Sequence, residues 1–147
     1  MAMQFTYLPD FPRRSIHEAD IAECEAYLGV ALPPDLRAFL LAHDGPVPNP
    51  AWIPIQVAGD TKWLGPIYSL TSVMGPLEGN ARAYAIEMRT AYHREEHKLP
   101  RHFVVFCNLL TQPSTLLLSV AAADHGTVYA WHVGMKRFKP DQLVRVA

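Results

Sequence analysis

The stretch HREEH, residues 93–97, carries the residue types of a metal-dependent hydrolase. It matches the His-x-x-Glu-His pattern of inverted zinc peptidases, in which two histidines on adjacent helical turns bind zinc beside a glutamate base. Such a site needs a third ligand, usually a glutamate further along the chain, but the carboxylates after His97 are Asp124 and Asp141. We therefore expect a solvated helix end without a bound metal, and the metal-dependent hydrolase stays as an alternative.

Side chains for nucleophilic catalysis are present, but their spacing matches no catalytic motif. His43 and Asp44 follow one apolar stretch, and His125 and His132 lie near the last predicted hairpin, so a histidine–carboxylate pair could form across the fold. None of the five serines lies in a glycine-flanked elbow, and the chain has no phosphate-binding glycine loop and no dinucleotide fingerprint. We expect no enzyme activity, no catalytic residue and no cofactor.

The charges are divided unevenly along a chain whose net charge is only -1. Residues 1–60 contain eight acidic and three basic residues, whereas residues 61–147 contain six acidic and ten basic ones. A general nucleic-acid binder needs a dominant basic surface, so we expect no nucleic-acid partner. The basic segment GMKRFKP, residues 134–140, is accordingly predicted to be a solvated turn.

The apolar runs are too short to span a membrane, and the start of the chain, MAMQFTYLPDF, lacks the basic and apolar parts of a signal peptide. We therefore expect a cytoplasmic protein without a membrane partner. Cys24 and Cys107 are too few for a disulfide framework or a zinc site, so both are predicted to be buried thiols.

A first helix is predicted over about residues 16–28. Ser15 and Glu18 have the spacing of a capping box, and Gly29 stands where the apolar periodicity ends. The residues expected on its core face are Ile21, Cys24 and Leu28.

A second, short helix is predicted within ALPPDLRAFLLAHDGP, residues 31–46. Pro33 and Pro34 suit the first helical turn, and Gly45 and Pro46 suit the end of a helix. The residues expected to pack on the first helix are Leu36, Phe39 and Leu40.

The rest of the chain is predicted to contain strands and one long central helix. That helix covers residues 80–98, and the stripe expected to face the core comprises Ala81, Ala85, Met88 and Tyr92. Strands are predicted within residues 51–57, 63–73, 102–110, 114–122 and 126–133, the last three as antiparallel neighbours. With 50% hydrophobic residues, the chain is expected to form a single α+β domain over residues 1–147. In it, the amino-terminal helix hairpin and the central helix cover one side of a mainly antiparallel sheet.

The order of these segments resembles the SUKH superfamily (Smi/Knr-like). IAECEAYLGVALPPDLRAFLLAHDG, residues 21–45, is similar to its signature of an acidic helix, Leu-Pro, a short helix and a closing Asn-Gly-Gly, with Asp44 and Pro46 departing from that close. LPRHFVVFCNLLTQPSTLLLSV resembles the strand pair after the family's central helix, and GTVYAWHV resembles its Gly-x-Val-Tyr-x-Trp strand, with His132 where an aspartate is common.

The resemblance implies an immunity protein that binds and neutralises a cognate bacterial toxin domain of a polymorphic toxin system. The alternative within the same superfamily is a regulatory or scaffold interaction module. Carboxylates near the amino terminus and tryptophans on interrupted strands are suited to bind a basic partner. We expect the contact residues to be Asp20, Glu23, Glu25, Asp44, Trp52, Asp60 and Trp63.

Overall fold

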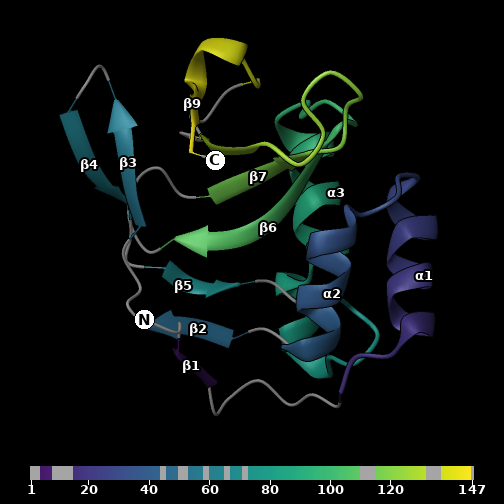
Figure 1. The fold of residues 1–147 in the computed structure, drawn as a ribbon. Coiled ribbons are helices and arrows are strands. Elements are labelled where there is room, and N and C mark those ends of the chain that lie inside the picture. The colour runs from purple at the N-terminus through teal and green to yellow at the C-terminus, as the bar shows by residue number, and fades with distance from the viewer. Residues whose placement is uncertain are drawn as a thin grey trace.

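The computed structural model describes residues 4–7, 15–43, 46–49, 53–57, 60–64, 67–70, 73–109, 115–131 and 137–146. Three α-helices, two 3-10 helices and nine strands are present in these ranges (Figure 1). The helices are α1 (Glu18–Leu28), α2 (Pro34–Ala42), η1 (Gly79–Tyr84), α3 (Ile86–Glu96) and η2 (Pro140–Gln142). The strands are β1 (Gln4–Tyr7), β2 (Pro46–Asn49), β3 (Ile53–Val57), β4 (Asp60–Leu64), β5 (Ile67–Leu70), β6 (Phe103–Leu109), β7 (Thr115–Ser119), β8 (Val128–Trp131) and β9 (Leu143–Arg145).

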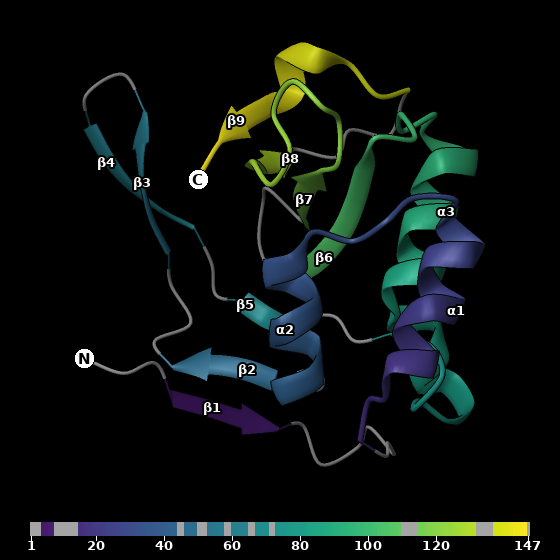
Figure 2. The same cartoon turned by 45° about the vertical axis from the view of Figure 1, so that its right-hand side comes forward.

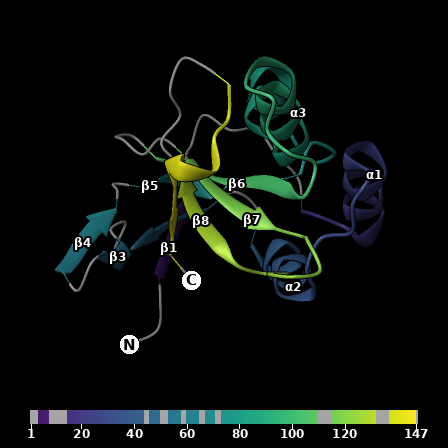
Figure 3. The ribbon, with the colours of Figure 1, turned by 90° about the horizontal axis from the view of Figure 1, so that it is seen from above.

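All the strand pairs in the described residues are antiparallel, which confirms the predicted α+β class. The main sheet has the order β5-β6-β7-β8-β9, and its centre contains the three predicted neighbouring strands. β1 pairs with β2, and β3 pairs with β4. The three α-helices gather at one end of the molecule, and the β3–β4 hairpin lies at the other (Figures 1 and 3).

Helix α1 matches the predicted helix but has a different cap. His17 is the N-cap, and its backbone N–H donates to the Asp20 carboxylate at 2.8 Å, so the predicted Ser15–Glu18 capping box is wrong. Gly29 ends the helix in the left-handed conformation with φ 73°, as glycine readily does.

Helix α2 begins at the predicted proline pair, with Pro34 as its first residue. It ends at Ala42 because His43 adopts an extended conformation, and Gly45 lies outside the described residues. Leu40 is 1% exposed and packs in the core, whereas Phe39 is only half-buried and lies against the ring of His43. Phe39 was therefore wrongly assigned to the core.

The predicted central helix is divided into two parts. Ala85 is extended between η1 and α3, so the expected stripe of Ala81, Ala85, Met88 and Tyr92 does not lie on one helix. Met88 is 37% exposed and Tyr92 is 49% exposed. The side chains that α3 buries are Ile86, Glu87, Thr90 and His93.

Glu87 and Thr90 fit on the buried face of α3 because they accept hydrogen bonds from neighbouring backbone. β5 pairs only with the second half of β6, and in the first half the Val105 N–H donates to the Thr90 hydroxyl at 3.0 Å. A helix side chain thus serves as acceptor beyond the end of β5. α1 packs against α3, as Figure 2 shows, and α3 packs against β6.

Two hydrophobic clusters form most of the described core. The first joins α1 and α2 to α3 and β6, and its members include Ile21, Cys24, Leu28, Leu40, Ile86 and Val104. The second lies on the sheet and comprises Leu99, Phe103, Val105, Leu117 and Trp131. Cys24 and Cys107 are buried free thiols, as predicted.

Candidate protein-interaction surface

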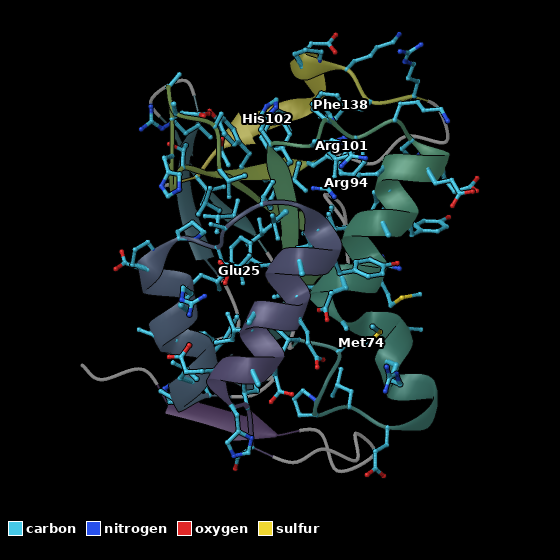
Figure 4. The ribbon with its side chains drawn as sticks, turned by 90° about the vertical axis from the view of Figure 1, so that its right-hand side faces the viewer. Glu25, Met74, Arg94, Arg101, His102 and Phe138 are labelled. Carbon is cyan, nitrogen blue, oxygen red and sulfur yellow. The ribbon has the colours of Figure 1, made fainter. Side chains whose placement is uncertain are left out.

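The acidic side chains of α1 have different roles. Arg37 of α2 pairs with Glu18 at 2.7 Å and also pairs with Glu25. Glu25 additionally accepts a hydrogen bond from the Leu32 N–H at 2.7 Å, so it fixes the turn between α1 and α2. Figure 4 shows Glu25 where these helices face each other. Part of the predicted acidic surface is therefore neutralised inside the hairpin.

Asp20 is a structural residue of the interior. Its side chain caps α1 and is 4% exposed. A Cβ built on Gly75 would lie 2.3 Å from Asp20 Oδ1, so the backbone at Gly75 closes directly over the carboxylate. A partner protein would have no direct access to Asp20 in this conformation.

Glu23 is the predicted α1 contact residue that points into solvent. Asp44 and Trp52 lie outside the described residues. Asp60 and Trp63 belong to β4, of which only the backbone is described, and Trp63 is paired in register with Pro54 of β3. Among the described elements, α1, which carries Glu23, lies apart from the β3–β4 hairpin (Figure 1).

The HREEH stretch does not form the solvated helix end that we expected at His93. His93 is 3% exposed, and its ring lies 5.0 Å from the Trp131 ring and 5.2 Å from the His97 ring, centroid to centroid. Neither ring nitrogen of His93 has a hydrogen-bond partner among the described residues. Burial, with help from Arg89 and His97, lowers the pKa of His93 from 6.5 to about 4. Within the described ranges, no group of three or more His, Cys, Asp or Glu side chains could hold a metal ion.

Two further polar side chains connect α3 to its neighbours. Glu87, 2% exposed, accepts the Met74 N–H with its two carboxylate oxygens at 3.1 and 2.9 Å, and it lies beside the Cys24 thiol. Burial raises the pKa of Glu87. Arg94 donates to the carbonyls of Leu28 and Arg101, both at 2.9 Å, which ties the end of α1 to the end of α3 (Figure 4).

The described part of the basic segment is built around a structural aromatic residue. Phe138 lies 5.7 Å from the rings of both Phe103 and Trp131, and it packs against the second core cluster. Arg137 and Lys139 on either side of it are exposed. Phe138 is therefore a half-buried packing residue of the fold.

An open groove of about 250 Å³ lies between the beginning of α2 and the main sheet. We call it the α2 groove; its lining residues are Pro33, Asp35, Leu36, Phe106, Leu118, Gly126 and Val128. Asp35 is the one charged residue among them, and it is exposed. Sequence reasoning missed this site because its strand residues have the ordinary pattern of a buried sheet, although Asp35 after two prolines marked the helix start.

With this geometry in place, the chain can be compared with known proteins. Residues 15–147 match the model of the SMI1 / KNR4 family (SUKH-1). The chain belongs to this family. SUKH proteins are known as immunity proteins that are generally non-catalytic and act through protein–protein interaction. No curated protein matches the chain, and no solved structure matches it either. Among the described helices of this SUKH protein, none has the length and hydrophobicity required to cross a membrane.

Replacing Glu25 is expected to destabilise the fold, whereas replacing Glu23 is not. Glu25→Ala removes the acceptor of the Leu32 N–H and a partner of Arg37, so we expect a loss of about 1–3 kcal/mol in the free energy of unfolding. Glu23→Ala, on the exposed side of the same helix, should change it by less than about 0.5 kcal/mol. Urea unfolding followed by circular dichroism measures both. Equal losses in the two variants would contradict the structural role of Glu25.

Acid is expected to destabilise the protein through His93. Its pKa is lower in the folded than in the unfolded chain, so its contribution is complete above pH 6.5 and is lost as the pH falls towards 4. The full loss is of the order of 3 kcal/mol. The raised pKa of Glu87 acts with the opposite sign, so the comparison must be made between variants.

The matched pair for this test is His93→Phe and His125→Phe, since His125 is exposed. Free energies of unfolding measured at several pH values from 7 to 4 should fall less steeply in His93→Phe than in the parent. His125→Phe should keep the slope of the parent. A parent slope retained in His93→Phe would show that another group causes the acid sensitivity.

Proposed function

We propose that this SUKH-family protein is an immunity protein that binds a cognate bacterial toxin domain and neutralises it by occluding the toxin's active cleft. The observation that carries the proposal is the family match over residues 15–147, in a family of immunity proteins. The partner is accordingly a protein domain, and the mode of action is binding rather than catalysis.

The chemistry of the described interior supports a binding role. Asp20 and Glu87 each accept backbone N–H groups, and His93 is held in an aromatic cluster. An inhibitor of this kind needs a rigid scaffold that loses little conformational entropy when it binds. Polar groups committed to holding helices together contribute to such rigidity.

The proposed contact surface contains carboxylates and aromatic residues. Glu23 contributes an exposed charge from α1, and such charges accelerate the encounter with a basic cleft. Further contacts are proposed for Asp44, Trp52, Asp60 and Trp63, with the tryptophans as anchors. Asp20 and Glu25 are not proposed as contacts, because both are engaged within the fold.

Co-expression with the toxin gene that neighbours this one tests the proposal. The parent should rescue cells poisoned by that toxin, and the two proteins should co-purify as a one-to-one complex. Glu23→Lys should weaken the rescue because it replaces an attractive charge by a repulsive one. The matched control is Glu95→Lys, which makes the same change at an exposed position of α3.

The possible outcomes test the immunity function and the proposed contact surface separately. Failure of the parent to bind or neutralise the neighbouring toxin would overturn the immunity function. Normal rescue by Glu23→Lys would overturn only the assignment of Glu23 to the contact surface. Equal weakening by both charge reversals would indicate a general charge effect rather than a local contact.

A further inference from the structure

The size of the α2 groove limits what it can accept. A cavity of about 150 Å³ already takes up a benzene-sized molecule. The α2 groove has about 250 Å³, which is enough for one large aliphatic or aromatic side chain but not for a helix. Its walls are mainly apolar, with Leu36 on one side and Phe106, Leu118 and Val128 on the sheet.

The groove is fixed from both sides before any partner arrives. Leu118, 7% exposed, belongs to β7, which is paired with β6 and β8. The turn that carries Gly126 is held by Asp124, which accepts hydrogen bonds from the Ser119 hydroxyl at 2.6 Å and the Tyr129 hydroxyl at 2.7 Å. A preformed site of this kind requires little ordering upon binding.

The charge at the rim is negative. Asp35 lines the groove and, within the described chain, has no ion pair or side-chain hydrogen bond. Among the described residues, the groove lining contains no lysine or arginine. The rim therefore favours a basic group next to whatever apolar side chain fills the groove.

From this geometry we propose that the α2 groove binds one aliphatic or aromatic side chain of the partner protein, next to a lysine or arginine that pairs with Asp35. The partner's identity rests on the proposed function, whereas the chemical preference of the groove does not. The arrangement has the features of an interface hot spot, in which one anchor enters a pocket and a charge fixes its orientation.

Two short peptides test the chemical preference without any toxin. Acetyl-Phe-Arg-amide and acetyl-Phe-Glu-amide are titrated separately into ¹⁵N-labelled protein at millimolar concentration. The basic peptide should shift the amide signals of Leu36, Leu118 and Val128 and bind several-fold more tightly than the acidic one. Asp35→Lys, at an exposed position, should reverse that preference.

Filling the groove tests the apolar part of the proposal. Val128→Phe places a ring in the groove and should abolish the peptide-induced shifts, whereas Ala22→Phe adds the same ring on the exposed side of α1 and should leave them unchanged. Absence of shifts at the groove in the parent, or an unchanged preference in Asp35→Lys, would overturn the proposal. If Val128→Phe does not fold, the peptide preference of Asp35→Lys still tests the proposal.

Two further outcomes identify a different occupant or a different function. A concentration-dependent dimer that Val128→Phe dissociates would assign the groove to a second copy of this chain and overturn the proposal. Peptide binding at the groove without toxin neutralisation by the parent would leave the groove in place and remove the immunity function. Toxin neutralisation without peptide binding at the groove would support the immunity function and overturn the proposal for the groove.

Discussion

The helical part of this structure depends on a buried carboxylate. Glu87 lies on the inner face of α3 with 2% exposure, beside the Cys24 thiol of α1, and accepts the Met74 N–H with its two oxygens. A buried polar group left without partners would cost free energy, so α3 has to lie where the Met74 N–H is within reach. Glu87 thereby fixes the position of α3 relative to the loop at Met74.

The need to pair polar groups within the fold also determines which charged side chains remain exposed for binding a partner. Asp20 and Glu25 are engaged by backbone N–H groups, Glu25 is also engaged by Arg37, and Arg94 is engaged by two carbonyls. The carboxylates that stay exposed without a described partner include Glu23 and Asp35. Charge counted along the sequence therefore overestimates the acidic surface offered to a partner. The α2 groove combines apolar walls with Asp35, an exposed carboxylate that has no ion pair among the described residues.

Much of the fold could be predicted from local signals. The proline pair, Gly29 and the apolar runs of β6, β7 and β8 fix where elements begin and end, whatever their surroundings. The inner face of α3 could not be predicted, because Glu87 and His93 resemble surface residues until their buried partners are known. Tertiary contacts outweighed periodicity there. β1, β2 and β9 were missed because they are three or four residues long, and β2 contains two prolines.

The candidate site was less predictable than the fold. Residue type and position marked Glu23 and Glu25 equally, and they differ in the structure because Arg37 and the Leu32 N–H lie beside Glu25. The α2 groove is made by α2 and by sheet residues 70 or more positions further along the chain, so no local pattern contains it. The family resemblance, by contrast, could be recognised because the order of short motifs is visible in the sequence alone. The family match confirmed it.

The central claim is that this SUKH protein acts by binding a toxin domain and that the α2 groove belongs to its contact surface. Hydrogen–deuterium exchange of the free protein and of its complex with the neighbouring toxin domain tests it most directly. The amides of Asp35 and Leu36 lie in the first turn of α2, where helical amides lack an intrahelical acceptor, so they should exchange rapidly in the free protein. The account predicts that their exchange, and that of residues 125–128, becomes slower in the complex. Unchanged exchange at these positions, with slowing confined to the outer face of α3, would contradict it.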